Sequence, residues 1–309
     1  MPNPITSSQF TKLLFNDLRE VTENAISELQ KKEDMINKVY RVISGDSAQE
    51  EFYDIGALPD IPEFNGKLTY LSLSPGYYTK IEPKEYAGGV MFERKLLDDK
   101  KYNVMMDAAG MLGNSYGRVE SKVAARPLAY AFSSAFDYMI SEEGVALCSS
   151  SHTTKSGTST SSGFANAGTS AISKTSVAAT RILMKKFRND ISERIVIEPN
   201  MLIVPDELYD KALEITGTER GLDSAEGTIN VHKGRYDVLN WLRLSDYDTN
   251  NWFMVDSSLM KKFMVWLNRI PPETNTTVDF ETFTVKHSIY GRYANGFTNW
   301  RFIYGHAVS

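Results

Sequence analysis

The sequence is poor in the residues that hold metals and act as nucleophiles. It has a single cysteine, Cys148, which excludes an intramolecular disulfide and a cysteine-based zinc site within one chain. The four histidines are scattered, at positions 152, 232, 287 and 306, and each is better explained as a hydrogen-bonding group than as a metal ligand. The sequence therefore predicts no cofactor and no metal.

Catalytic and nucleotide-binding motifs are also missing. There is no G-x-G-x-x-G or G-x-x-x-x-G-K-[ST] loop, no H-E-x-x-H and no G-x-S-x-G elbow. The acidic pairs Asp98-Asp99 and Glu142-Glu143 are adjacent in sequence, so on a helix they would not face each other as an acid–base pair would. We therefore expect a protein that is not an enzyme.

One enzymatic alternative stays open. Residues 149–163 contain thirteen Ser, Thr or Gly among fifteen positions, which predicts a flexible surface loop. His152 lies in this loop, four residues after Cys148, and a Cys or Ser hydrolase could use either residue. No oxyanion hole or third catalytic group is visible around them.

Charge and hydropathy exclude further classes. The net charge is −5 and no cluster of five or more Lys and Arg occurs. This argues against tight phosphate binding. Such a protein can still enclose nucleic acid without binding it tightly. No apolar run approaches the roughly 20 residues that span a bilayer. The start, MPNPITSSQF, lacks the basic and apolar regions of a signal peptide. We expect no association with a membrane.

The informative stretch is residues 76–101, GYYTKIEPKEYAGGVMFERKLLDDKK. It is extended, rich in Tyr and charge, and leads into a long helical segment. We predict strands at 67–74, 77–82 and 85–94 that form a long hairpin, which needs something to pack on. Such a projection is suited to gripping neighbouring molecules.

Helical periodicity predicts two long helices. Apolar residues recur at helical spacing over 7–32, and this helix is expected to lie either on its own domain or against a partner. The second helix covers 96–140, with a bend at its glycines or a kink at Arg126-Pro127.

The rest of the chain alternates short elements without a βαβ repeat, so the fold class is α+β. Helices are expected at 173–189 and 206–216, and a loop at 217–227. Strands are expected at 195–197, 201–204, 228–232, 236–244, 252–255, 280–290 and 297–304, with a strand or short helix at 261–267 before Pro271-Pro272 end that block.

These features, in this order, resemble those of a known family. The run from Gly76 into the long helix resembles the E-loop and spine helix of tailed-phage major capsid proteins, in particular the Mu-like major head subunit family. Further stretches match in the same order: GVALCSSSH at 144–152, EPNMLIVP at 198–205, NVHKG at 230–234 and NWRFIYG at 299–305. The matches cover nearly the whole chain from about residue 10.

The resemblance implies the Hong Kong 97 phage fold. Its parts would be an N-terminal arm, 1–50; an E-loop, 51–95; a peripheral domain with the spine helix, 96–197; an axial domain, 198–285; and C-terminal strands, 286–309, that return to the peripheral domain. It also implies a major head protein that assembles into an icosahedral shell around double-stranded DNA. The alternative within phages is another structural part, such as a tail-tube or scaffold protein.

The same resemblance implies contact residues and partners. E-loop contacts are expected at Tyr70, Tyr77, Tyr78, Lys80, Glu82, Lys84, Glu85, Glu93 and Arg94, and arm contacts at Phe10, Leu14 and Leu18. The partners would be further copies in hexamers and pentamers, a scaffold protein, a portal and decoration proteins, with DNA enclosed without sequence-specific binding. Because the chain starts near its arm, a separate scaffold or prior cleavage is expected. Assembly would take place in the host cytoplasm, and the product would be the virion capsid.

Overall fold

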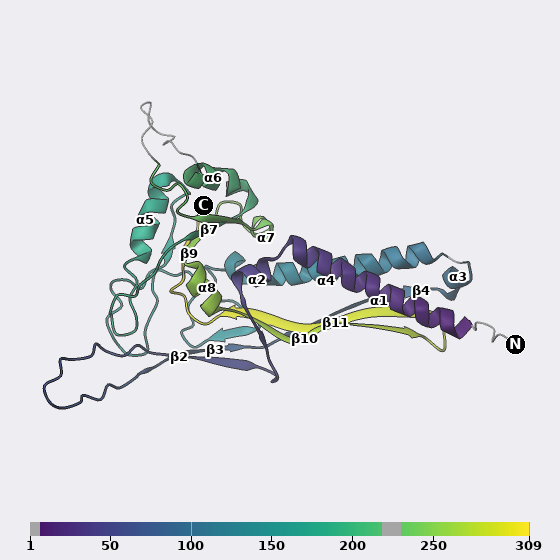
Figure 1. Cartoon of the computed structure of the whole chain (residues 1–309), viewed down its shortest axis with the longest axis horizontal. Helices are drawn as coiled ribbons and strands as arrows, with labels where there is room; N and C mark the ends of the chain where they lie inside the picture. Colours follow the sequence, from purple (N-terminus) through teal and green to yellow (C-terminus); the bar gives the residue numbers. More distant parts are fainter. Residues whose placement is uncertain (1–6, 100, 218–229, 309) are drawn as a thin grey trace, which may run out of the picture.

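A computed structural model describes residues 7–99, 101–217 and 230–308, without the side chains of 7–14 and Leu97. The chain forms three parts: a long arm, a compact lobe at one end of the arm, and a loop that projects below the lobe (Figure 1). The arm and the lobe are each built from segments that are distant in sequence.

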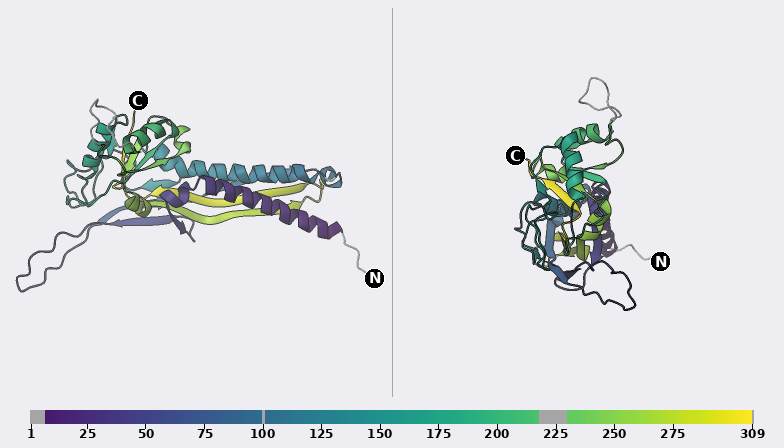
Figure 2. Two further views of the ribbon diagram at one scale, coloured as in Figure 1. Left: turned by 45° about the horizontal axis from the view of Figure 1, so that its top comes forward. Right: turned by 90° about the vertical axis from the view of Figure 1, so that its left-hand side faces the viewer.

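The arm consists of two long helices on one face of a sheet. The helices are α1 (Ser7–Lys32) and α4 (Tyr102–Ala129). The sheet has the order β1-β10-β11-β4. Its strands are β1 (Arg41–Ser44), β10 (Met264–Val278), β11 (Val285–Phe297) and β4 (Lys84–Phe92). Here α4 packs over β11 and β4 while α1 packs over β10, so the helices and strands run the length of the arm together (Figure 2).

The glycines of α4 serve close helix packing. The helix is continuous from 102 to 129, so neither the predicted bend at the glycines nor a kink at Arg126-Pro127 divides it, and Pro127 lies in its last turn. A Cβ on Gly113 would lie 2.5 Å from the Thr22 carbonyl oxygen of α1. A side chain there would push the two helices apart.

The bounds of the predicted helix at 96–140 are also corrected. The structure has a short helix, α3 (Arg94–Asp98), followed by α4.

The arm has its own apolar core at the far end. Leu18, Phe92, Met105, Ala109 and Val285 form one buried cluster that joins α1, β4, α4 and β11. At its edge, buried His287 contacts Thr22 Oγ1 through Nε2 at 2.9 Å. The helix at 7–32 is therefore confirmed, and it packs on its own chain.

The compact lobe is built around a five-stranded sheet of order β6-β12-β9-β7-β8. Its strands are β6 (Ala167–Gly168), β12 (Ile303–His306), β9 (Trp252–Val255), β7 (Met201–Val204) and β8 (Asp237–Asn240). Its helices are α5 (Lys174–Met184), η1 (Asp206–Leu208), α6 (Tyr209–Gly217), α7 (Leu242–Ser245) and α8 (Ser257–Phe263), while α2 (Met35–Val39) joins α1 to the arm sheet. A capping box at Ser173 and Ser176 starts α5, as the sequence predicts.

The expected hairpin at 67–94 is wrong. Residues 67–74 form no strand, and β3 (Pro75–Ile81) pairs with β2 (Glu50–Ile55) and β5 (Met139–Ser141) in a separate three-stranded sheet. Strand β4 pairs with β11 in the arm instead. Because Pro83 separates β3 from β4, the chain leaves one sheet and enters another at that point.

Several smaller predictions also fail. Strand β10 continues through Pro271-Pro272, where its pairing with β11 shifts register. On its other side, β10 pairs with β1 only up to Asn268. The two prolines therefore lie where that edge of β10 is unpaired, a position that tolerates proline. Residues 195–197 and 298–302 are not strands. Apart from Gly217, the predicted loop at 217–227 lies outside the described residues, as do residues 228–229 of the predicted strand at 228–232. Residues 230–232 are described and are not a strand.

The expected division at residue 285 does not follow the sheets. A boundary there separates β10 from β11, although the two strands pair along the arm from Met264 opposite Phe297 to Val278 opposite Val285. Of the C-terminal residues 286–309, β11 lies under α4, but β12 pairs with β9 and β6 in the compact lobe. The C-terminal strands therefore connect the arm to the lobe.

Candidate intersubunit surfaces

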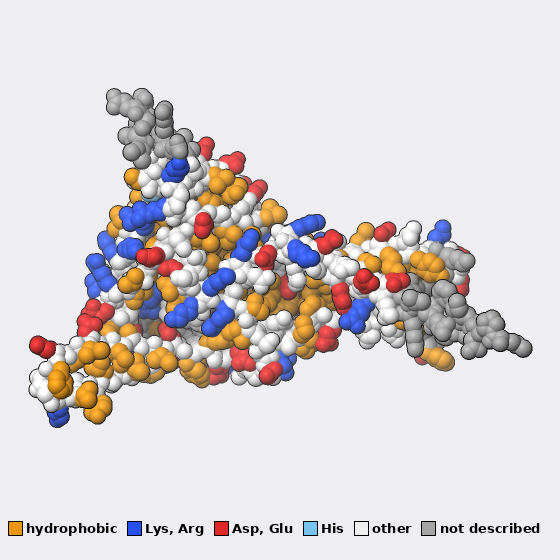
Figure 3. Space-filling model, viewed as in Figure 1, with side chains coloured by type: hydrophobic (Ala, Val, Ile, Leu, Met, Phe, Trp, Pro, Cys, Tyr) orange, Lys and Arg blue, Asp and Glu red, His pale blue; other side chains and the backbone are white. Residues whose placement is uncertain are grey.

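The projecting loop, residues 56–74, carries the largest group of exposed apolar side chains. We call this group, together with two residues of β2, the loop ridge: Tyr53, Ile55, Leu58, Ile61, Phe64, Leu68, Tyr70 and Leu73. Tyr70 is 93% exposed and Ile61 88%. Apolar atoms line the projection from root to tip (Figure 3). A contiguous apolar surface of this kind is typical of an interaction site.

The root of the loop is anchored by polar contacts. Asn299 donates a hydrogen bond to Asp54 Oδ2 at 2.9 Å, and the Ala57 backbone N–H donates to Asp190 Oδ1 at 2.8 Å. At the mouth, the Gly56 N–H donates to the Ser74 carbonyl at 3.0 Å. The loop therefore leaves the body at a fixed place while its side chains remain free to bind.

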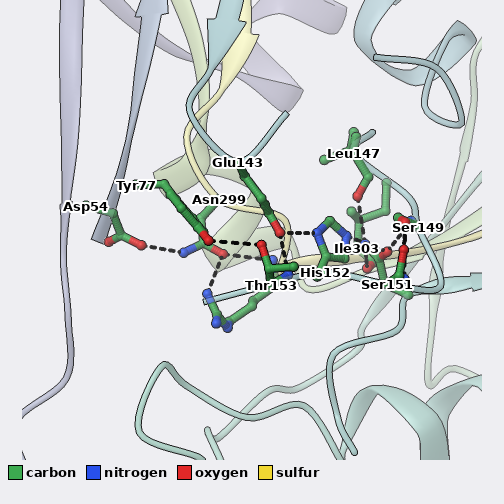
Figure 4. A network of polar contacts seen from close by, with 12 residues as sticks. Asp54, Tyr77, Glu143, Leu147, Ser149, Ser151, His152, Thr153, Asn299 and Ile303 are labelled. Atoms are coloured by element: carbon green, nitrogen blue, oxygen red, sulfur yellow. Dashed lines mark hydrogen bonds and ion pairs between the residues drawn. The ribbon is translucent and has the colours of Figure 1, made fainter. Parts of the chain in front are cut away.

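A second set of contacts holds β3 at the same root. Tyr77 Oη and Thr153 Oγ1 lie 2.9 Å apart (Figure 4). The Tyr78 N–H donates to Glu142 Oε2 at 3.2 Å. The first contact ties the root directly to the Ser/Thr-rich segment 149–163, and the second reaches it through the ion pair of Glu142 with Lys155. That segment thus braces the projecting loop.

The charged groups at the root are partly buried. Burial raises the pKa of Asp54, although nearby Arg301 and the bond from Asn299 act in the opposite direction. Burial lowers the pKa of Arg301, whose guanidinium lies 4.8 Å from the Trp300 ring centroid. Both residues line a cavity of ≈ 290 Å³ beneath the root. Burying these charges is tolerated because each has polar or aromatic partners.

The surroundings of Cys148 and His152 differ from those of a Cys–His catalytic pair. Cys148 is buried, and burial raises the pKa of its thiol well above the usual range, so the nucleophilic thiolate is disfavoured. His152 Nδ1 contacts Glu143 Oε1 and Nε2 contacts Asn166 Oδ1, each at 3.0 Å. Both ring nitrogens are therefore engaged in contacts inside the lobe.

His152 is instead part of the packing of the lobe. Its ring stacks on Trp300 at 4.1 Å between centroids, and it is 2% exposed. Its neighbour Asn166 accepts from the Ser149 N–H and donates to the Leu147 and Ile303 carbonyls (Figure 4). The predicted flexible loop thus has an ordered inner edge.

The structure does not bring the predicted E-loop residues together. Of that set, Tyr70 lies on the projecting loop, whereas Tyr77, Tyr78 and Lys80 lie on β3 at its root. Glu82, Lys84 and Glu85 lie where the chain crosses into the arm sheet, and Lys84 Nζ is 3.8 Å from Glu82 Oε1.

Glu93 and Arg94 lie at the far end of the arm, where the Arg94 guanidinium is 5.7 Å from the Phe283 ring centroid. This end exposes a second, smaller apolar group: Met91, Val278, Phe280 and Phe283.

The expected arm contacts divide into two cases. The side chains of Phe10 and Leu14 lie outside the described residues. Leu18 is 0% exposed, because it is enclosed by α4, β4 and β11. In this conformation Leu18 is unavailable to a neighbour, which contradicts its assignment as an intersubunit contact.

Sequence reasoning missed most of the loop ridge. The segment 52–65 looks irregular because Gly56, Pro59 and Pro62 interrupt it. The available signal was composition: residues 56–74 carry Asp60, Glu63 and Lys67 as their only charges, among many apolar residues. An apolar, proline-interrupted segment that cannot form a core is best explained as a surface for a partner.

Within the described part of the chain, no cluster of His, Cys, Asp and Glu could hold a metal ion. None of its helices is both long and apolar enough to cross a bilayer.

Comparison with known proteins gives one family and a consistent set of folds. A family model described as phage capsid protein matches residues 77–305. Comparison with curated protein sequences finds no match.

Among solved structures, the chain is similar to the mature capsid of bacteriophage PhiM1, with a TM-score of 0.56, 11% identity and coverage of 89% of this chain and 86% of that chain. It is also similar to the capsid of cyanophage P-SCSP1u, with a TM-score of 0.52, 11% identity and coverage of 89% and 88%. The capsid of a native GTA particle gives a TM-score of 0.52, 11% identity and coverage of 89% and 90%.

Proposed function

The chain belongs to the phage capsid protein family, and we propose that its copies close an icosahedral head by laying the projecting loop over neighbouring copies. The observation that carries this proposal is the loop ridge. Its side chains are exposed and apolar on a loop whose root is held in place. Burying one such side chain in an interface gives about 1.5–3 kcal/mol before the costs of association.

The fold matches that of the Hong Kong 97-like phage capsids, and this match supports an assignment of its parts. In this proposal the projecting loop with β2 and β3 is the E-loop, and α4 is the spine helix. The arm sheet with α4 is the peripheral domain, and the compact lobe is the axial domain. Within phages, the Mu-like major head subunits are the proposed subfamily, supported by the sequence motifs at 144–152, 198–205 and 299–305.

The proposed partners follow from that role. Copies form hexamers and pentamers, and a scaffold protein, a portal and decoration proteins join them during or after assembly in the host cytoplasm. The shell encloses double-stranded DNA without reading its sequence, which agrees with a net charge of −5. The charges at Lys80, Glu82, Lys84, Glu85, Glu93 and Arg94 would set the register of contacts more than their affinity.

We also propose that the protein has no enzymatic activity. Buried Cys148 has a thiol whose raised pKa disfavours the thiolate, and both nitrogens of His152 are occupied. A thiol-reactive probe should label the folded protein slowly and the urea-unfolded protein quickly. Rapid stoichiometric labelling of the folded protein at neutral pH would contradict this assignment.

Negative-stain microscopy of the purified protein tests the main function. We expect closed, roughly spherical shells or their ring-shaped capsomers when the protein is concentrated, alone or with its scaffold. Tubes of stacked rings would favour a tail-tube protein, and monodisperse monomers under every condition, scaffold included, would contradict a capsid role.

A further inference from the structure

Two surfaces of the compact lobe carry opposite charge. Residues 174–188, which comprise α5 and the turn after it, contain Lys174, Arg181, Lys185, Lys186 and Arg188 and no acidic residue. We call this surface the basic flank. Within a chain of net charge −5, such a segment is a local excess of positive charge.

The acidic flank is formed by η1 and α6, residues 206–217. It contains Asp206, Glu207, Asp210 and Glu214, with Lys211 as its single cation. Figure 1 draws α5 and α6 on different sides of the lobe sheet. In Figure 3, basic side chains gather along the left edge of the lobe and acidic ones along its upper right edge.

Seven of these charged side chains form no ion pair with another described residue. Among the described residues, the ion pairs do not include Lys174, Arg181, Lys185 or Lys186, nor do they include Asp206, Glu207 or Asp210. Asp206 accepts from Asn240 Nδ2 at 2.5 Å and Glu207 accepts from Ser245 Oγ at 2.8 Å. These bonds orient the two carboxylates and leave their charge available.

Each flank also exposes apolar side chains beside its charges. On the basic flank Ile182 is 50% exposed and Leu183 39%. On the acidic flank Leu213 of α6 is 40% exposed, and Leu242 of α7, which packs against η1, is 53% exposed. An apolar centre with charged residues around it is the usual arrangement of a protein–protein interface.

We propose that the basic flank of one lobe binds the acidic flank of the lobe of a second copy. Because the two flanks are different surfaces of one molecule, the contact is heterologous and repeats from copy to copy, closing into a ring when the rotation allows. The opposite charges select this pairing and disfavour like-charged contacts. The inference rests on the proposed shell function and names the surfaces by which its lobes meet.

Charge reversal with rescue tests the pairing. Lys185→Glu with Lys186→Glu reverses the basic flank, and Glu207→Lys with Asp210→Lys reverses the acidic flank. Each double variant should reduce the yield of shells or rings at least tenfold in low salt, measured by sedimentation and negative-stain microscopy. The quadruple variant, in which both flanks are reversed, should recover most of the yield.

Lys31→Glu with Lys32→Glu is the matched control, since these adjacent exposed lysines also lie at the C-terminal end of a helix. It should assemble as the wild type does. Normal assembly of both flank variants, or a folded quadruple variant that fails to recover, overturns the pairing while leaving the shell function intact. Normal shells that lose only DNA content in the Lys185 and Lys186 variant would assign the flank to nucleic acid and also overturn it.

If the wild type forms no shells at all, the proposed function fails separately. In that case, sedimentation equilibrium of the wild type still tests the lobe contact, which should produce oligomers that dissociate as salt is raised. Their absence at low salt would overturn the pairing as well.

Discussion

The projecting loop and the α1–α4 helix pair are both long, narrow parts of the molecule, but they use their apolar residues in opposite ways. In the helix pair, Leu18 and Met105 are 0% exposed, and glycine lets the backbones approach closely. In the loop, Ile61 and Tyr70 are almost fully exposed. The helices bury these side chains against each other and the arm sheet within one chain, whereas the apolar side chains of the loop are left exposed.

This difference separates folding from assembly. Changes in the helix pair should lower the free energy of unfolding, and changes in the loop should act on association alone.

Leu18→Ala should lower the free energy of unfolding by about 2–5 kcal/mol, because it leaves a cavity in the cluster formed with Phe92, Met105 and Val285. Tyr70→Ala is the control and should change it by no more than about 0.5 kcal/mol, since Tyr70 is exposed. Urea unfolding of the unassembled protein measures both. Equal effects would remove the distinction between the two regions.

Acid should lower the free energy of unfolding of the arm and lobe, because both bury histidines. The projecting loop contains no histidine and should not contribute. Burial lowers the pKa of His306 from 6.5 to about 4 and also lowers that of His287. The unfolded chain therefore binds more protons as pH falls below 6.5, and stability is lost in that range.

For His306 the loss between pH 7 and pH 5 should be about 2 kcal/mol. His306→Gln should show a correspondingly smaller loss in urea unfolding at the two pH values. An unchanged pH dependence in that variant would contradict the assignment.

Gly113→Ala should lower the free energy of unfolding by about 1–2 kcal/mol, because the added Cβ meets the Thr22 carbonyl oxygen at 2.5 Å. Gly110→Ala is the matched control. Its Cβ would lie 3.6 Å from Val21 Cγ1, so the better helix propensity of alanine should leave stability equal or raise it by up to about 1 kcal/mol. Thermal unfolding compares the two, and stabilisation by both would show that α1 and α4 are not in close contact at Gly113.

Helix α1 and strands β7 and β9 were predictable because their apolar periodicity is local. The pairing of β3 and β4 was not, since each finds its partners far away in sequence: β2 and β5 for the one, β11 for the other. The glycines of α4 were mistaken for a bend because their reason, contact with Thr22 and its neighbours on α1, lies about 90 residues away.

The candidate surfaces show the same limit. Tyr70 was predicted as a contact residue and is exposed on the projecting loop. Leu18 was also assigned to a partner, although it packs within its own chain. An exposed and a buried apolar residue look alike in sequence. His152 lies in a Ser/Thr-rich segment that looks mobile, and it is held by Glu143, Asn166 and Trp300 from other parts of the chain.

The most direct test is a loop variant that combines Ile61→Ser, Phe64→Ser, Leu68→Ser and Tyr70→Ser, compared with the wild type by urea unfolding and by negative-stain microscopy. We expect a free energy of unfolding within about 0.5 kcal/mol of the wild type and no closed shells. Closed shells at wild-type yield, or a loss of stability comparable to that of Leu18→Ala, would contradict a loop whose apolar surface is reserved for other copies.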